Sequence, residues 1–131
     1  MILVDTGVWF DFFAGVEPSA GATERLLVEK RAALSATTAF ELRAGVIGKK
    51  RLQQIARLVG MVPLLPLTTE VALIAGELYT TLKAKGRLVG NEDLFLAATA
   101  LEIGVPVLTL NRKHFERVPD LEVLDPAEVV R

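Results

Sequence analysis

The 131-residue sequence contains no cysteine and only one histidine, His114. Without cysteine, disulfide bonds, thiolate metal ligands and cysteine nucleophiles are all excluded. A serine–histidine–aspartate triad would have to use His114, but its neighbours Lys113 and Phe115 form no nucleophile motif. We therefore expect oxygen and nitrogen groups to carry the chemistry, and we interpret His114 as a polar residue in a short turn whose neighbour Phe115 packs inward.

Long hydrophobic runs are also missing, since the longest stretch without a charged residue, residues 58–69, has twelve residues and two prolines. A membrane span needs roughly 20 apolar residues. The first apolar run is interrupted by Asp5 and Asp11 and follows no basic region, unlike a signal peptide. These features predict a soluble, cytoplasmic protein with no membrane partner. The formal net charge of −1 argues against broad electrostatic coating of nucleic acid, but it leaves a local binding site open.

Glycine motifs that bind nucleotides are also absent. Apolar strand segments and helical segments alternate along the whole chain. Continuously apolar strands separated by helices predict a parallel sheet covered on both faces. The expected fold is a single α/β domain over residues 1–131, built as a three-layer α/β/α sandwich. The predicted strands are residues 2–4, 33–36, 61–67, 105–109 and 121–124.

The helical segments differ in how clearly the sequence marks them. The clearest spans residues 69–85 and closes at Gly86, a residue suited to the left-handed conformation after a helix. Another spans residues 92–103 between a cap at Asn91 and a stop at Gly104, and its apolar residues lie almost all round, which predicts burial. A third, amphipathic segment is predicted from the spacing of Leu52, Ile55, Ala56 and Val59.

Three acidic residues stand at strand or helix ends, and each has a structural explanation. Asp5 follows the first strand and can cap a helix. Glu41 lies three residues after Thr38, which is the spacing of a capping box. Asp93 lies in the first turn of its helix, where the helix dipole favours a carboxylate.

The shared location of these acids favours a functional explanation. Ligands of open α/β sheets bind beyond the carboxyl ends of the strands, and all three acids are expected near that edge. Converging carboxylates repel one another, so they should either raise a pKa or bind a hard divalent cation. Oxygen ligands without thiolates select Mg²⁺, with Mn²⁺ as the alternative. Such a cation can activate water and stabilise charge on a phosphoryl oxygen, as phosphodiester hydrolysis requires.

At this point the sequence resembles PIN-domain proteins, and closely the VapC toxin ribonucleases of bacterial and archaeal toxin–antitoxin pairs. The matching pieces, in order, are ILVDTGVWFDFF, TTAFELRAG and NEDLFLAATALEIGVPVLTLNRKHFERVPDLEVLDP. Together they cover most of the chain. No single piece is specific, but the ordered set indicates the family.

The resemblance implies that Asp5, Glu41 and Asp93 hold Mg²⁺ and activate the attacking water. A fourth acid of the family, after the fourth strand, corresponds here to Asn111, whose amide lacks the charge but can ligate through its oxygen or hold a metal-bound water. Basic residues after that strand, Arg112 and Lys113, are predicted to contact RNA phosphates.

Hydroxyl groups and aromatic rings complete the expected binding surfaces. Thr6 and Thr109 are predicted to contribute hydroxyls to the substrate edge, with helix capping as the alternative. The N-terminal helix carries Trp9, Phe10, Phe12 and Phe13, more rings than one face of a short helix can bury. The resemblance implies that some of them meet a partner, either a VapB-type antitoxin or a second copy in a homodimer, and core packing is the alternative.

The leading hypothesis is thus a Mg²⁺-dependent endoribonuclease toxin silenced by a cognate antitoxin that occludes the acidic pocket. A non-catalytic PIN-like module that binds RNA or protein is a second hypothesis, because Asn111 leaves the metal ligation incomplete. A third, a phosphatase with Asp5 as nucleophile, lacks a second aspartate or lysine in a convincing position.

Overall fold

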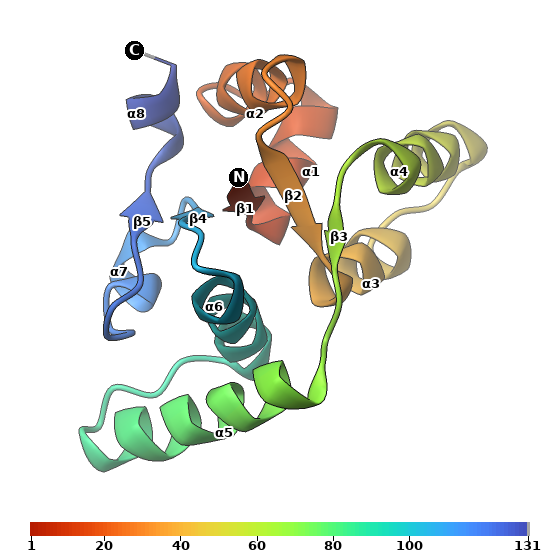
Figure 1. The fold of residues 1–131 in the computed structure, drawn as a ribbon. Helices are drawn as coiled ribbons and strands as arrows, with labels where there is room; N and C mark the ends of the chain where they lie inside the picture. The colour runs from red at the N-terminus through yellow and green to blue at the C-terminus, as the bar shows by residue number, and fades with distance from the viewer. Residues whose placement is uncertain (131) are drawn as a thin grey trace.

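A computed structural model describes residues 1–130, and within this range the chain forms one five-stranded sheet (Figure 1). The strand order is β3-β2-β1-β4-β5, and every neighbouring pair is parallel. The predicted parallel α/β fold is confirmed. The strands are β1 (Ile2–Val4), β2 (Ala32–Ser35), β3 (Leu64–Leu65), β4 (Val107–Leu108) and β5 (Val123–Leu124).

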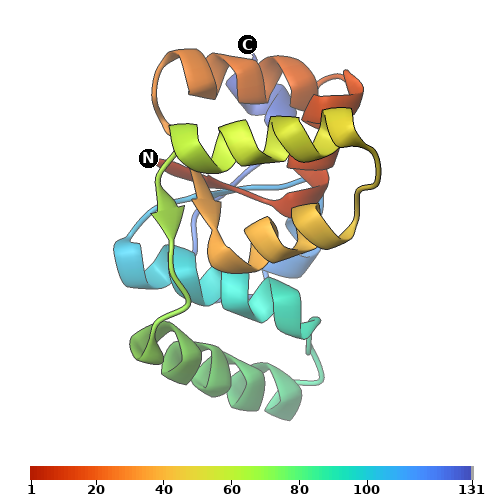
Figure 2. The same ribbon diagram turned by 90° about the vertical axis from the view of Figure 1, so that its right-hand side faces the viewer.

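Helices cover both faces of the sheet and make the predicted three layers (Figures 1 and 2). Alternate side chains of β1 point to opposite faces, so Leu3 belongs to one core while Ile2 and Val4 belong to the other. The Leu3 core includes residues of α5 and α6, and α5 packs on the outer side of α6 (Figure 2). The other core includes residues of α1, α2, α3 and α4. The helices are α1 (Thr6–Ala14), α2 (Ser19–Val28), α3 (Ala36–Ala44), α4 (Lys49–Met61), α5 (Thr69–Ala84), α6 (Asn91–Ile103), α7 (Arg112–Phe115) and α8 (Pro126–Val129).

The strand order determines where a ligand can bind. From β1 the chain moves outward to β2 and β3 on one side, and β4 and β5 extend the sheet on the other. The direction of winding therefore reverses between β1 and β4, and such a switch point leaves a crevice at the carboxyl ends of the strands. Asp5 directly follows β1 and Thr109 directly follows β4, so both lie at this crevice.

The start of α3 differs from the prediction. The helix begins at Ala36, and its N-cap is Ser35, whose hydroxyl accepts a hydrogen bond from the Thr38 amide at 3.0 Å. The prediction that Thr38 caps this helix was wrong, because β2 passes into α3 without an intervening loop. Ser35 is fully buried, and its hydroxyl satisfies an amide that could not otherwise reach water.

The third strand is shorter than predicted, since α4 continues through Met61. Val62 is extended, as expected for the residue before a proline, and the helix therefore ends there. On α4 the buried residues are Ile55 and Leu58, whereas Ala56 and Val59, which were expected on the buried face, are exposed.

The two helices on the other face largely follow the prediction. After α5, Gly86 has a positive φ of 66°, and the amides of Gly86 and Arg87 bond back to Lys83 and Leu82, which closes the helix as expected. Helix α6 is mostly buried and ends at Gly104, also as predicted. Its N-cap is Gly90 rather than Asn91, and no side chain caps it. None of the helices within residues 1–130 is long and apolar enough to cross a bilayer.

Candidate functional site

Asp5 is both a helix cap and the centre of the polar crevice. Its Oδ1 accepts a hydrogen bond from the Thr6 amide at 2.8 Å, so it caps α1 as the structural alternative predicts. Its Oδ2 accepts a second hydrogen bond from the Thr109 hydroxyl at 2.7 Å. Burial raises the pKa of the Asp5 carboxyl, these two hydrogen bonds lower it, and the negative charges of Asp93 and Glu41 raise it again, so that the pKa lies above its ordinary value.

Glu41 faces the same crevice from α3. The predicted capping box with Thr38 is wrong, because Ser35 is the cap and the Glu41 side chain does not return to its own helix start. Instead, the Thr6 hydroxyl donates to Glu41 Oε1 at 2.9 Å, and it lies 3.0 Å from the Thr38 hydroxyl. Thr6 therefore links Glu41 to Asp5, through its hydroxyl and its amide respectively.

Asp93 lies in the first turn of α6, as predicted, with its side chain 26% exposed. Its Oδ2 is 3.3 Å from Nδ1 of His114, and the same ring nitrogen is 2.7 Å from Nδ2 of Asn111. His114 does lie on a one-turn helix, and Phe115 beside it is buried, as expected. Its contact with Asp93 was not predicted, and nothing in the local sequence indicates it, since the two residues meet only through the packing of α7 on α6.

Thr109 and Asn111 connect the two halves of the site. Thr109 has no exposed surface, and while its hydroxyl donates to Asp5 it also accepts from the Asn111 amide at 2.9 Å. The Thr109 hydroxyl thus lies beneath the surface at which the predicted substrate contact would form, and its partners in the structure are Asp5 and Asn111. Asn111 is exposed, and its side-chain amide turns toward His114.

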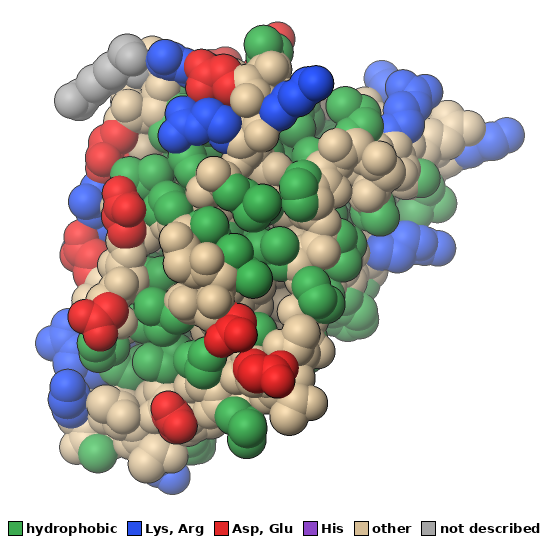
Figure 3. All heavy atoms as spheres, in the orientation of Figure 1, with side chains coloured by type: hydrophobic (Ala, Val, Ile, Leu, Met, Phe, Trp, Pro, Cys, Tyr) green, Lys and Arg blue, Asp and Glu red, His purple; other side chains and the backbone are tan. Residues whose placement is uncertain are grey.

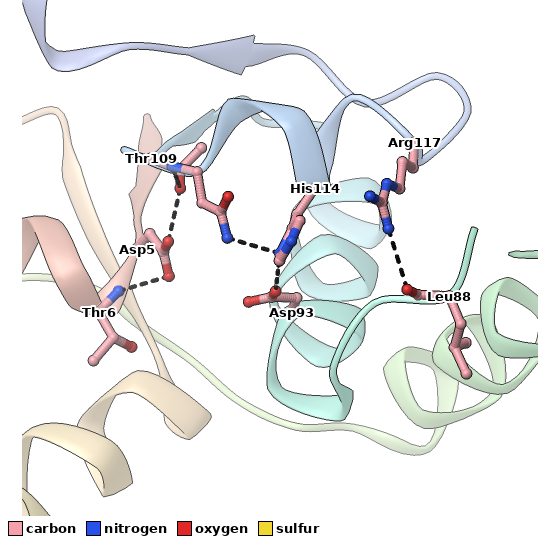
Figure 4. A network of polar contacts seen from close by, with 8 residues as sticks. Asp5, Thr6, Leu88, Asp93, Thr109, His114 and Arg117 are labelled. Atoms are coloured by element: carbon pink, nitrogen blue, oxygen red, sulfur yellow. Dashed lines mark hydrogen bonds and ion pairs between the residues drawn. The ribbon is translucent and has the colours of Figure 1, made fainter.

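A continuous chain of hydrogen bonds thus joins the three acids. Figure 4 shows the part of it that runs from Thr6 to Asp93. It begins at Glu41, crosses Asp5 at its middle and ends at Asp93. The three acids come from separate parts of the fold: the end of β1, the middle of α3 and the start of α6. The residues of this polar chain are, in order, Glu41, Thr6, Asp5, Thr109, Asn111, His114 and Asp93.

The two predicted RNA-contacting cations have different surroundings. Arg112 forms ion pairs with Glu116, at 2.7 Å, and with Glu128 of α8. Hydrogen bonds to these two carboxylates raise the pKa of Arg112 and neutralise its charge locally. Lys113 is exposed and forms no ion pair within residues 1–130. Lys113 therefore fits the predicted role better than Arg112.

The polar chain can be tested for its fit to a hard divalent cation. Its acidic members carry oxygen donors, and within residues 1–130 no lysine or arginine forms an ion pair with any of the three acids. Burial is the main cause of the raised pKa of Asp5, and the negative charges of Asp93 and Glu41, which a cation would offset, add to it. The described residues contain no group of three acidic or histidine side chains arranged as a ready-made metal cage. The chemistry of these oxygen ligands fits Mg²⁺ or Mn²⁺.

A second candidate surface lies at the opposite edge of the sheet. It is an apolar groove that joins a hollow of about 410 Å³ to one of about 300 Å³ through the shared residues Leu27 and Met61. Phe12 and Phe13 of α1 line the smaller hollow and are half-buried, whereas Trp9 is fully buried in the core. Ala32 and Pro63, at the amino ends of β2 and β3, line the larger one. Apolar side chains cover much of the face drawn in Figure 3.

Comparison with known proteins gives a consistent result. The family model described as the PIN domain matches residues 2–121. The chain is 31% identical over 119 residues to ribonuclease VapC1 of Methanocaldococcus jannaschii, covering 91% of this chain and 82% of that protein. It is 32% identical over 124 residues to ribonuclease VapC19 of Mycobacterium tuberculosis, covering 93% and 98%.

Solved structures agree with the sequence comparison. DNA-bound VapBC from Salmonella typhimurium matches with a TM-score of 0.83 and 26% identity, covering 95% of this chain and 97% of that one. VapBC-1 from nontypeable Haemophilus influenzae matches with a TM-score of 0.81 and 28% identity, covering 97% and 99%.

Proposed function

The chain belongs to the PIN-domain family and is of the VapC type, and from this premise we propose that it is a Mg²⁺-dependent endoribonuclease toxin neutralised by a VapB-type antitoxin. The proposed reaction is hydrolysis of an RNA phosphodiester bond. Water attacks phosphorus in line with the leaving oxygen, and no covalent enzyme intermediate forms.

The observation that carries this proposal is the polar chain at the switch point of the sheet. Three carboxylates that are distant in sequence are joined there through Thr6, Thr109, Asn111 and His114. A fold that needed only stability would not gather like charges without a neutralising lysine or arginine, because each added carboxylate raises the cost of ionising the others. A bound divalent cation would explain why three carboxylates are gathered at this edge.

We assign the metal-holding role to Asp5, Glu41 and Asp93, with the amide oxygen of Asn111 as a neutral ligand or as a partner of a bound water. When bound, Mg²⁺ would supply charge that stabilises the phosphoryl oxygen and lowers the pKa of water. Thr109 and Thr6 act through the acids that they orient, since each holds a carboxylate by a hydrogen bond.

For the RNA itself, we propose that Lys113 contacts a phosphate beside the scissile bond. It is exposed next to His114, whereas the guanidinium of Arg112 would first have to leave Glu116 and Glu128. Masking the acidic charges with a cation would also remove the main electrostatic barrier to a polyanion at this edge.

We propose that one segment of the antitoxin occludes the acidic pocket and that another segment covers the apolar groove. Relatives of known structure are VapBC assemblies, and an apolar segment of a partner could cover Phe12, Phe13 and Met61, which a single chain leaves partly exposed. A homodimer is also part of this proposal, and light scattering of the antitoxin-free protein tests it: a mass near twice 14.2 kDa is expected, and the monomer mass would contradict it.

One observation favours a second function. Asn111 is an amide, and the described acids do not form a closed metal cage. A PIN-like module that binds RNA or protein without cutting RNA would have such a site.

Both functions can be tested with antitoxin-free protein and a labelled pool of cellular RNA. We expect wild-type protein with Mg²⁺ to cut RNA and EDTA to stop it. Asp5→Asn and Asp93→Asn should be at least about 100-fold slower, as expected when several kcal/mol of transition-state stabilisation are lost. The matched control is Glu102→Gln, an exposed substitution at the far end of α6. RNA that stays intact but bound would support the non-catalytic module instead.

A further inference from the structure

The short helix α7 holds the start of α6 at two points. Nδ1 of His114 lies 3.3 Å from the Asp93 carboxylate, and the Arg117 guanidinium, just beyond α7, donates to the Leu88 carbonyl at 3.2 Å (Figure 4). Leu88 precedes α6 and Asp93 lies in its first turn. Residues 114–117 therefore contact both the loop that precedes α6 and the Asp93 carboxylate in its first turn.

Helix α7 is itself firmly placed. Phe115 is 1% exposed and belongs to the same core as residues of α6. On the outer side, Arg112 ties α7 to Glu128 of α8. The buried Phe115 and the Arg112–Glu128 ion pair thus fix the position of α7 on two sides. His114 is therefore held in place and can orient a neighbouring side chain.

Asp93, in contrast, has little else to orient it. Its side chain is partly exposed, α6 lacks a side-chain cap, and in the part of the chain that the structure describes, His114 is the side chain that hydrogen-bonds the Asp93 carboxylate. A partly exposed aspartate in the first turn of a helix can adopt more than one rotamer. The contact at Oδ2 selects one of them and leaves Oδ1 free to face the crevice.

We propose that His114 is a positioning residue that holds Asp93 for metal binding. In this role Nδ1–H donates to Asp93 Oδ2. The structure places Nδ2 of Asn111 2.7 Å from the same ring nitrogen, and because that nitrogen cannot donate and accept at once, the role requires the Asn111 amide to be rotated about χ2 so that its oxygen takes this position. His114 therefore orients an acid and an amide at once. This role rests on the proposed function, because it gives the Asp93 carboxylate its orientation toward the cation.

Mn²⁺ binding to the antitoxin-free protein tests the role without any measurement of RNA cleavage. Removing a hydrogen-bond partner of a metal ligand typically weakens metal affinity by 10- to 100-fold. In calorimetric titration, His114→Ala should bind Mn²⁺ about tenfold more weakly than wild type. His114→Asn should recover most of this loss, because its amide nitrogen reaches the place of Nδ1. The melting temperature without metal should change little in either variant.

Each other result overturns the role in a distinct way. Unchanged Mn²⁺ affinity in His114→Ala shows that the contact does not matter. If His114→Asn weakens Mn²⁺ binding as much as His114→Ala does, the imidazole ring is needed and not the hydrogen bond. If the melting temperature without metal falls strongly, the role of His114 is structural. If wild type itself binds no Mn²⁺, or Asp5→Asn binds it equally well, the proposed metal site fails and this role fails with it. Glu102→Gln again serves as the control.

Discussion

The two edges of the sheet carry different kinds of side chain. At the carboxyl edge, the side chains of the polar chain are hydrogen-bonded to one another, yet within residues 1–130 no lysine or arginine forms an ion pair with its carboxylates. At the amino edge, the groove is apolar, and Met61 is 71% exposed beside it. The carboxylates of one edge therefore lack a lysine or arginine partner, and the apolar side chains of the other edge lack a cover. The two edges should therefore bind different ligands. We expect a cation and RNA at the carboxyl edge and a protein segment at the amino edge.

The strongest test of this contrast places a charge in the groove. Met61→Glu should weaken antitoxin affinity at least about 30-fold, the equivalent of about 2 kcal/mol, because the partner would bury a carboxylate. Cleavage of RNA should be unchanged, since Met61 lies at the other edge. Binding is measured by calorimetry with antitoxin released from the native complex. The matched control is Leu73→Glu on α5, at a site 66% exposed; equal weakening there would show that the groove is not the binding surface.

A smaller effect is expected from the buried hydroxyl of the polar edge. Thr109→Val keeps the shape but removes the donor to Asp5 and the acceptor for the Asn111 amide. We expect about tenfold slower cleavage and about 1–2 kcal/mol lower unfolding free energy. Denaturant unfolding and a cleavage assay measure the two effects. Thr109→Ser, which keeps the hydroxyl, should recover most of the activity, and failure to do so would contradict the hydrogen-bond explanation.

The two neighbouring cations of the polar edge should differ more modestly. Lys113→Ala is expected to weaken RNA binding about threefold and to lower its salt dependence, whereas Arg112→Ala should change RNA binding less, because its charge is already paired. Fluorescence anisotropy at several salt concentrations distinguishes them. The reverse order would show that Arg112 leaves Glu116 and Glu128 when RNA binds.

The smallest effect concerns pH and stability without metal. Because the pKa of Asp5 is raised in the folded state, the folded protein holds this proton more tightly than the unfolded chain. Wild type should lose stability relative to Asp5→Asn as pH rises from about the ordinary value of 3.8 through the raised pKa. The variant should then melt a few degrees higher at neutral pH in EDTA. Scanning calorimetry between pH 4 and 7 measures the difference, and a difference independent of pH would contradict the unfavourable ionisation of Asp5.

Much of the fold followed from local pattern. The apolar runs predicted the parallel strands, and the all-apolar helix 92–103 was buried as expected. The errors occurred at the boundaries of elements. Because β2 passes directly into α3, Ser35 and not Thr38 is the helix cap. Helix α4 continues to Met61, just before Val62 and Pro63, so β3 begins later than predicted. The positions of the three acids near one edge were predicted, but their partners were not.

The sequence by itself determined which residue types stand after each strand and at each helix start, since these depend on backbone preferences a few residues long. Tertiary structure alone decided that Glu41 meets Thr6, that Thr109 holds Asp5, and that Arg112 turns to Glu128. The first two contacts join residues 35 and 104 positions apart. Such pairings depend on how helices pack against the sheet, and local sequence carries no record of that packing. For the same reason the sequence did not predict the contact between His114 and Asp93, which forms because α7 packs against α6.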